Sequence, residues 1–459
     1  MRKNPINLPV LASFGCLALS APAQAEALDD LRAEIQAQKA RLEKLEARLQ
    51  ATAASADRAN QKAEQASKAV AEAAVPAKDN SLSMPAGLSI YGIADAGIEI
   101  GDYGNGTKVR AQSGIGSASR LGFKGLREFG DDLSAYFQLE AGVSIDNGQS
   151  SGHSSNISKP GGGNTSSAAP NTTGIAVFSR NTFVGLKSKK FGDLRLGRDY
   201  APIYSLARSS DPFRIGGGTA YRLWGSAAVG RFDNGIFYAS PKLAGFQGKI
   251  AYSAGMENNS EADVGVTGGA PGNIAGGPQG EGKGGSASLT YAKNQLFVGA
   301  AYLSFQRSGT VAAPATENIN RSSYNLAATY NFGFVKVYGQ YLVGKDTQNG
   351  AAVNPSLDSA VWWLGASIPF ADRHIVRGVY GHLDDRLTAD RDSDHFGLGY
   401  EFALDKQTDL YAYYAQVSNQ NGGQNSICAG GTCQGYDKNS GLPPNYTPKS
   451  LMFGARYRF

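Results

Sequence analysis

The order of apolar and polar residues divides the chain into a segment with a heptad repeat and a longer segment in which the two kinds alternate. Over residues 28–73 the heptad a positions are Leu28, Ile35, Leu42, Leu49, Ala56, Ala63 and Val70. From residue 88 onward apolar and polar residues alternate, clearly so over residues 133–140. A heptad repeat predicts a coiled coil, and alternation predicts β-strands with one apolar face.

The heptad repeat predicts an α-helical coiled coil over residues 26–75. The d positions are Leu31, Gln38, Leu45, Thr52, Ala59, Ala66 and Ala73. At about 1.5 Å per residue such a helix would be about 70 Å long, so we expect it to project. The polar d residues Gln38 and Thr52 should set register and oligomeric state. A single amphipathic helix packed on a core is the alternative. Pro76 ends the helix, and residues 76–87 are the expected linker.

The alternating segment predicts an all-β transmembrane domain over residues 88–459. Within 133–140 the residues Leu133, Ala135, Phe137 and Leu139 share one face, and the opposite face is polar. The pattern recurs often enough for about sixteen strands, an even number as bacterial barrels have. Tight turns, as at 331–334, alternate with long segments such as 200–230 and 419–448. This combination predicts a 16-stranded antiparallel β-barrel, with a soluble sandwich as the alternative.

The first residues and the composition place the chain outside the cytoplasm. Residues 1–25 combine Arg2 and Lys3 with an apolar stretch and an Ala-Gln-Ala site, which predicts a cleaved signal peptide. Cys16 leaves a lipoprotein leader as the alternative. Past the leader no apolar run is long enough for a membrane helix, and the mean hydropathy is −0.30. Abundant Gly, Tyr and Phe (59, 22 and 20 residues) with only 4 Met suit a barrel with aromatic girdles.

Charge and cysteine content exclude several partners. The formal charge of +5 is too small to predict nucleic-acid binding. Without Cys16, only Cys428 and Cys433 remain, in Cys-Ala-Gly-Gly-Thr-Cys, and we expect them to form a disulfide in a surface loop. A metal site is the alternative, but no His lies nearby. We expect neither a metal nor a cofactor.

Several motifs resemble one family. IYGIADAG at 90–97, SRLGFKG at 119–125, FVGL at 183–186, GDLRLGRD at 192–199 and YASPKLAGF at 238–246 are similar to strands of trimeric general porins of Neisseria- and Burkholderia-like bacteria. The final YRF ends on Phe459, which resembles the signal read by the barrel-assembly machinery. The resemblance implies a homotrimer in the outer membrane of a Gram-negative bacterium, in contact with outer-membrane lipid and lipopolysaccharide.

The resemblance also implies where the pore narrows. The third external loop of this family folds into the barrel, and residues 200–230 occupy that place, with Gly216, Gly217 and Gly218 permitting a sharp path. The residues expected at the constriction are basic ones on the wall and on the loop, together with one acid of the loop. They are Arg120, Lys124, Arg180 and Arg231 on the wall, Arg208, Arg214 and Arg222 on the loop, and Asp211 as the acid.

Physical chemistry gives separate grounds for these arginines. An Arg on the lipid face at mid-depth would cost about 2–4 kcal/mol, so an Arg within an alternating strand should face the lumen. A row of cations in a narrow pore attracts anions and repels cations. The alternative is that each Arg pairs with a lumenal Asp95, Glu99 or Glu140 and only stiffens the wall.

The leading functional hypothesis is therefore not an enzyme but a water-filled channel for passive diffusion of small hydrophilic solutes, preferring anions. An outer-membrane hydrolase is the catalytic alternative, based on His382 with Asp384 and Asp385. The coiled coil, expected in the periplasm, suggests two more: a tether to peptidoglycan with the barrel as anchor, or a brace for the trimer. It also resembles coils of certain dicarboxylate-uptake porins, which implies a substrate-specific channel for small carboxylates.

Overall fold

The structure, a computed structural model, describes most of the barrel and little of what precedes it. The described residues are 87–148, 150–151, 177–227, 230–255, 283–308, 318–348, 357–427 and 442–459, with six helical residues between 36 and 50. The chain divides into two units, Met1–Ser83 and Met84–Phe459. The predicted signal peptide, nearly all of the predicted coil and linker, and Cys428 and Cys433 lie outside the described residues.

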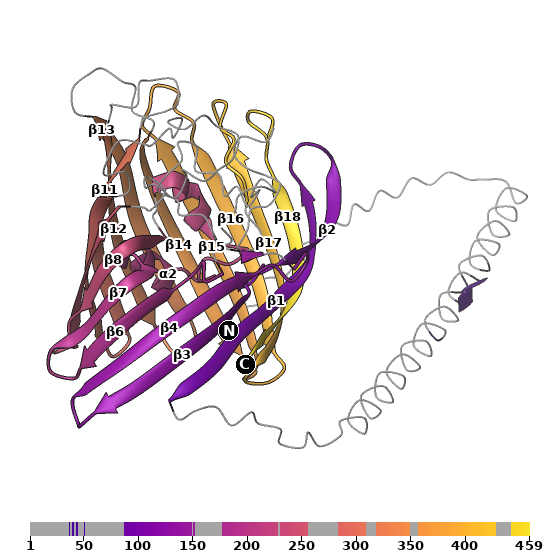
Figure 1. Ribbon diagram of the computed structural model, residues 1–459. Coiled ribbons are helices and arrows are strands. Elements are labelled where there is room, and N and C mark those ends of the chain that lie inside the picture. Colours follow the sequence, from indigo (N-terminus) through magenta and orange to yellow (C-terminus); the bar gives the residue numbers. More distant parts are fainter. Residues whose placement is uncertain are drawn as a thin grey trace, which may run out of the picture. The chain divides into compact units, whose positions relative to one another are not determined.

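The second unit is one antiparallel sheet that closes on itself (Figure 1). The described residues of this unit form eighteen strands, which are β1 (Leu88–Asp102), β2 (Thr107–Ser113), β3 (Arg120–Phe129), β4 (Leu133–Val143), β5 (Ser150–Ser151), β6 (Thr182–Ser188), β7 (Gly192–Tyr200), β8 (Arg231–Ala239), β9 (Phe246–Ala254), β10 (Lys283–Lys293), β11 (Leu296–Ser308), β12 (Asn318–Asn331), β13 (Lys336–Gln348), β14 (Asp358–Phe370), β15 (His374–Asp385), β16 (Ser393–Ala403), β17 (Thr408–Asn419) and β18 (Lys449–Arg458). The circle closes where β1 pairs with β18.

Two of the short strands share a position in the wall with the strand that follows them. β2 pairs with one half of β1 and β3 with the other half, and β5 and β6 divide β4 in the same way. Eighteen strands less these two leave sixteen positions among the described residues. The predicted sixteen-stranded barrel is therefore confirmed.

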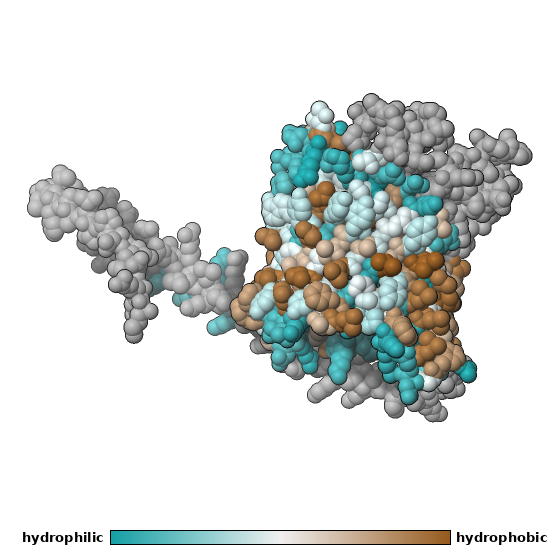
Figure 2. Space-filling view, turned by 90° about the vertical axis from the view of Figure 1, so that its left-hand side faces the viewer, coloured by the Kyte–Doolittle hydropathy of each residue, from teal (hydrophilic) through white to brown (hydrophobic). Residues whose placement is uncertain are grey.

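Alternation along the strands separates a lipid-facing surface from a lumenal one. In β16, Phe396, Leu398 and Tyr400 are exposed on the outside, whereas His395 on the other face is buried. Apolar residues concentrate in a band on the outer surface, with hydrophilic residues above and below it (Figure 2). Within the described part of the chain, no helix is long and apolar enough to span a membrane. The apolar band is what a barrel presents to lipid.

The segment between β7 and β8, at the fifth and sixth wall positions, folds into the barrel. It contains α2 (Pro202–Ser209) and the 3-10 helix η1 (Ala220–Ala227). The Gln340 side chain donates to the carbonyl oxygen of Ala207 at 2.8 Å, and the amide of Gly217 donates to that of Ile115 at 2.8 Å. These bonds attach the inward loop to β13 and to the turn between β2 and β3. The third external loop therefore lies where the resemblance implied.

The inward loop forms the hydrophobic core of the barrel together with one side of the inner wall. Its apolar side chains, among them Leu206, Phe213 and Trp224, are buried in one cluster with wall residues such as Leu342 and Trp363. Burying a large apolar side chain stabilises a fold by about 1.5–3 kcal/mol. The loop is consequently a packed part of the barrel, and only the rest of the lumen can hold water.

Glycines leave space for the loop on this side of the wall. A Cβ atom on Gly397 would lie 2.1 Å from the carbonyl oxygen of Gly218, and one on Gly365 would lie 2.7 Å from Cγ of Pro212. A Cβ on Gly399 would lie 2.6 Å from the ring of Phe213. A side chain at any of these positions would displace the loop toward the barrel axis.

Gly397→Ala tests this packing. The added methyl group should push the backbone at Gly218 into the pore, lower the single-channel conductance and destabilise the barrel by about 1–3 kcal/mol, as overpacking does. Gly378→Ala on the neighbouring strand is the matched control, because its nearest non-adjacent atom is 3.9 Å away. Conductance in planar bilayers and heat resistance on gels are the measurements. Equal conductance in both variants would show that the loop does not rest on the wall at Gly397.

Candidate pore constriction

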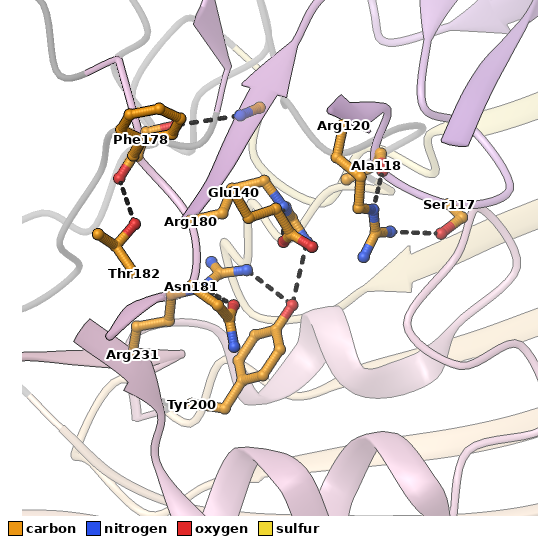
Figure 3. Close-up of polar contacts among 12 residues, drawn as sticks. Ser117, Ala118, Arg120, Glu140, Phe178, Arg180, Asn181, Thr182, Tyr200 and Arg231 are labelled. Atoms are coloured by element: carbon orange, nitrogen blue, oxygen red, sulfur yellow. Dashed lines mark hydrogen bonds and ion pairs between the residues drawn. The ribbon is translucent and has the colours of Figure 1, made fainter. Parts of the chain in front are cut away.

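The three wall arginines lie at the second, fourth and sixth strand positions of the wall, on the side away from the loop's apolar contacts. Arg120 begins β3, Arg231 begins β8, and Arg180 lies just before β6. The hydroxyl group of Tyr200, at the end of β7, accepts hydrogen bonds from Arg180 at 3.0 Å and from Arg231 at 2.6 Å (Figure 3). The Arg231 guanidinium also lies 4.2 Å from the centre of the Tyr200 ring. One tyrosine thus holds two cations together.

Arg180 is paired with an acid. Its Nε donates to Glu140 at 2.6 Å, and both side chains are buried, with exposed fractions of 7 % and 5 %. Glu140 also accepts a hydrogen bond from the hydroxyl of Tyr91 at 2.9 Å. A buried pair of this geometry ties β6 to β4 and β1. Arg180 therefore forms an ion pair with one of the acids that the sequence offered as its partner.

Arg120 and Arg231 are held by neutral acceptors. Arg120 donates to the carbonyl oxygen of Ala118 at 2.9 Å and to the hydroxyl of Ser117 at 2.8 Å (Figure 3). Arg231 donates from Nε to the side-chain oxygen of Asn181 at 2.9 Å. Among the residues that the structure describes, neither guanidinium forms an ion pair. Their positive charges are fixed in direction and not neutralised by a bonded carboxylate.

Asp95 and Glu99, the other two acids considered as partners of the wall arginines, bind other groups. Asp95 accepts hydrogen bonds from the amides of Gly116 and Ser117 and from the hydroxyl of Tyr411. It therefore shapes the turn that carries the acceptors of Arg120. Glu99 pairs with Arg110 at 2.5 Å, on the β1 to β2 hairpin. Neither carboxylate pairs with a constriction arginine.

The predicted basic residues of the loop occupy three different environments. Arg208, in the last turn of α2, is partly exposed and lies near enough to Arg120 for their like charges to interact. Arg214 is exposed in the turn after α2. Arg222 is half-buried beside the rings of Tyr204 and Tyr221. On the wall, Lys124 is exposed with Nζ 4.1 Å from the ring of Tyr91.

Asp211 has a different place from the pore-lining acid that the sequence led us to expect. It is 1 % exposed, and its carboxylate accepts hydrogen bonds from the amides of Phe213 and Ile215 and from the hydroxyl of Thr219. Burial raises the pKa of Asp211, and these hydrogen bonds oppose the shift. The reason is local: a short acid followed by a tight turn caps the turn's own amide groups. The loop surface is left with arginines as its charged residues.

Sequence reasoning missed Tyr200 and Asn181, which orient the arginines. Tyr200 directly follows GDLRLGRD, and Asn181 lies two residues before FVGL, but neither carries a charge that would single it out. Tyr200 is drawn in Figure 3 between Arg180 and Arg231. For Asn181, its place directly after the predicted lumenal Arg180 was the available signal.

His382 does not contact the acids proposed for a hydrolytic site. Its Nδ1 lies 3.0 Å from Asp394, which also accepts from the hydroxyl of Tyr380. Asp384 pairs instead with Arg386 at 3.0 Å. The ring centre of Trp362 is 6.1 Å from that of His382, on the outward face of the barrel. Across the described ranges, no group of three or more His, Cys, Asp or Glu is placed to hold a metal ion.

Comparison with known proteins agrees with this architecture. The chain is 27 % identical over 72 % of its length to an outer membrane porin protein of Bordetella pertussis, covering 89 % of that protein. It is 28 % identical over 85 % of its length to outer membrane porin protein 32 of Delftia acidovorans, covering 99 % of it. Among solved structures, an anion-selective porin from Comamonas acidovorans superposes with a TM-score of 0.64 at 23 % identity, over 81 % of this chain and 99 % of that one.

The family model described as Gram-negative porin matches residues 51–422, which is most of the chain. Together with the closed barrel, its apolar outer band and the inward loop, this match shows that the chain belongs to the Gram-negative porins, the channel-forming barrels of the outer membrane.

Proposed function

We propose that this porin is a water-filled channel for passive diffusion of small hydrophilic solutes, with a preference for anions. The observation that carries the proposal is the placement of Arg120 and Arg231, whose charges have neutral hydrogen-bond partners and no bonded acid among the described residues. Arg208 adds a third cation across from Arg120. The one acid of the loop, Asp211, is buried.

The physical effect of these cations is selective enrichment. Fixed charges at a narrow point between low-dielectric walls focus the potential, which raises the local concentration of anions and lowers that of cations. In bulk water the interaction energy of two unit charges 8 Å apart is about 0.5 kcal/mol. Each arginine therefore contributes roughly a twofold preference for anions over cations. Several arginines acting in the same direction multiply this effect.

Similarity to known porins supports the proposal without carrying it. The Comamonas acidovorans protein with a similar barrel is an anion-selective porin, and at 23 % identity that likeness bears on the fold. The preference in this chain rests on its own arginines and on the partners that leave them charged.

We also propose a homotrimer with the coiled coil on the periplasmic side. The resemblance to trimeric porins supports three copies, and a parallel coil of three helices over residues 26–75 would match that number. The short turns at 130–132 and 371–373 lie at the same rim as Leu88, where the barrel begins, which supports a periplasmic coil. Phe459 remains the proposed assembly signal, with its backbone bonded in both directions to Gly92.

The first test is the reversal potential across a planar bilayer under a salt gradient. We expect the wild type to prefer anions, and Arg120→Gln and Arg231→Gln each to lower the preference roughly twofold, because each removes one lumenal charge. Arg386→Gln is the matched control, since Arg386 is exposed near the outer rim and pairs with Asp384. A cation preference in the wild type would contradict the proposal.

A second test separates the paired arginine from the unpaired ones. Glu140→Gln should increase the anion preference, because it removes the negative partner of Arg180. It should also destabilise the barrel by about 3–5 kcal/mol, because a buried charge is left uncompensated. Reversal potential and the temperature at which the barrel unfolds on gels measure the two effects. Unchanged stability would show that the pair does not brace the wall.

A third test concerns the coiled coil. Deleting residues 26–76 should leave the conductance nearly unchanged, because the pore is built by the barrel, and should lower the heat resistance of the trimer or the integrity of the envelope. Native gels after heating and detergent sensitivity of cells are the measurements. If both stay normal, the coil neither braces the trimer nor tethers the membrane to peptidoglycan.

A further inference from the structure

The turn after α2 holds two consecutive residues in a conformation that side chains avoid. Arg214 and Ile215 have φ angles of 52° and 65°, in the left-handed region. Such strain in residues other than glycine persists only where surrounding contacts impose it. Here the imposing group is Asp211, whose carboxylate accepts the amide of Ile215 at 2.6 Å and the hydroxyl of Thr219 at 2.6 Å. Asp211 therefore determines where the backbone of Arg214 points.

The same turn is attached to the barrel wall. Arg377 on β15 donates to the carbonyl oxygen of Pro212 at 2.8 Å. The ring of Pro212 packs against Gly365, where a Cβ atom would lie 2.7 Å from its Cγ. The ring of Phe213 packs edge-on against Tyr413, with ring centres 5.5 Å apart. With its neighbours fixed in this way, Arg214 is the exposed side chain of the turn.

The wall near Arg214 belongs to the end of the barrel with the short turns. Lys336 is the first residue of β13, directly after the turn at 332–335, and Arg377 is three residues past the start of β15, which follows the turn at 371–373. Short turns mark the periplasmic rim of an outer-membrane barrel. Arg214 thus faces the periplasmic half of the lumen. Arg120 lies at the opposite end of β3 from the turn at 130–132, level with Ile93 of β1, and the wall continues beyond it as β2.

The charges around Arg214 are mostly positive. Arg214 interacts electrostatically with Arg377, Glu401 and Arg208, and Lys336 interacts with both Arg214 and Arg377. The acid, Glu401, is already bound by Arg377 at 3.0 Å and lies 3.7 Å from Arg456. Within the described residues, Arg214 and Lys336 form no ion pair, and Nζ of Lys336 lies 5.0 Å from the ring of Tyr338.

We propose that Arg214 and Lys336 form a second anion-binding station, for carboxylates and other compact anions, on the periplasmic side of the inward loop, with Asp211 as the residue that positions Arg214. Arg208 interacts with both Arg120 and Arg214, so it links this station to the constriction. An anion leaving the constriction then meets cations as far as the inner mouth. This station rests on the proposed anion preference. It adds a binding site for anions on the periplasmic side of the inward loop.

Succinate added to one side of a bilayer holding full-length porin of known orientation tests the station. Arg214→Gln and Lys336→Gln should each weaken block from the periplasmic side about twofold, and leave block from the external side unchanged, since each removes one charge at the inner end. Arg120→Gln should reduce the anion selectivity measured by reversal potential, and Arg386→Gln serves as the control. Equal periplasmic block in wild type and Arg214→Gln, with selectivity still lowered by Arg120→Gln, would overturn the station and leave the proposed function standing. A cation-selective wild type would overturn the proposed function itself.

The role of Asp211 is tested by the sign of the effect. Asp211→Ala removes an acid, so charge alone would strengthen the block by succinate. If Asp211 positions Arg214, the block from the periplasmic side weakens as it does in Arg214→Gln. Asp211→Asn keeps one hydrogen-bond acceptor and should retain most of the wild-type block. Heat resistance on gels confirms that the variants fold, and a stronger periplasmic block in Asp211→Ala would overturn the positioning role.

Discussion

The rest of this structure depends on satisfying backbone hydrogen bonds where lipid offers no partner. Within a bilayer each unpaired N–H or C=O group costs several kcal/mol, so a sheet can span it only as a closed barrel. Here closure is the pairing of β1 with β18, from Ile93 opposite Arg458 to Asp102 opposite Lys449. Phe459 extends it by exchanging two backbone bonds with Gly92. The closed wall creates an outside that must be apolar and an inside that can hold charge.

The inside of the wall is divided between packing and permeation. On β10 to β16 much of the lumenal face is apolar or glycine, and the inward loop covers it with its own apolar side chains. The side formed by β3, β6, β7 and β8 keeps polar residues facing the remaining space. Because the loop is bound on one side, its Arg208 lies near enough to Arg120 on the other side for their like charges to interact. The apolar packing of the loop and the polar residues that face the remaining space therefore lie on different parts of one wall.

Hydrogen-bond partners distinguish the arginines of the wall from one another. Arg180 is neutralised by its ion pair with Glu140 on β4. Glu140 also accepts a hydrogen bond from Tyr91 on β1, so the pair connects β1, β4 and the segment before β6. Arg120 and Arg231 are held as firmly by carbonyl, hydroxyl and amide oxygens, which orient a guanidinium without cancelling its charge. The pairing of Arg180 with Glu140 fits the structural brace weighed from the sequence, and the neutral partners of Arg120 and Arg231 fit the proposed anion filter.

The sequence by itself determined the strand positions, their number, the lumenal direction of the arginines and the loop that enters the pore. These follow from alternation and turn residues, which are local, and from the cost of charge in lipid. Only the tertiary structure decided the partners. Arg377 donates a hydrogen bond to the carbonyl of Pro212, 165 residues away in the sequence, and Tyr411 donates one to Asp95, 316 residues away. The burial of Asp211 depends on a turn that the wall holds in place. Such contacts arise when the barrel closes and brings distant strands to one lumen, which no local pattern encodes.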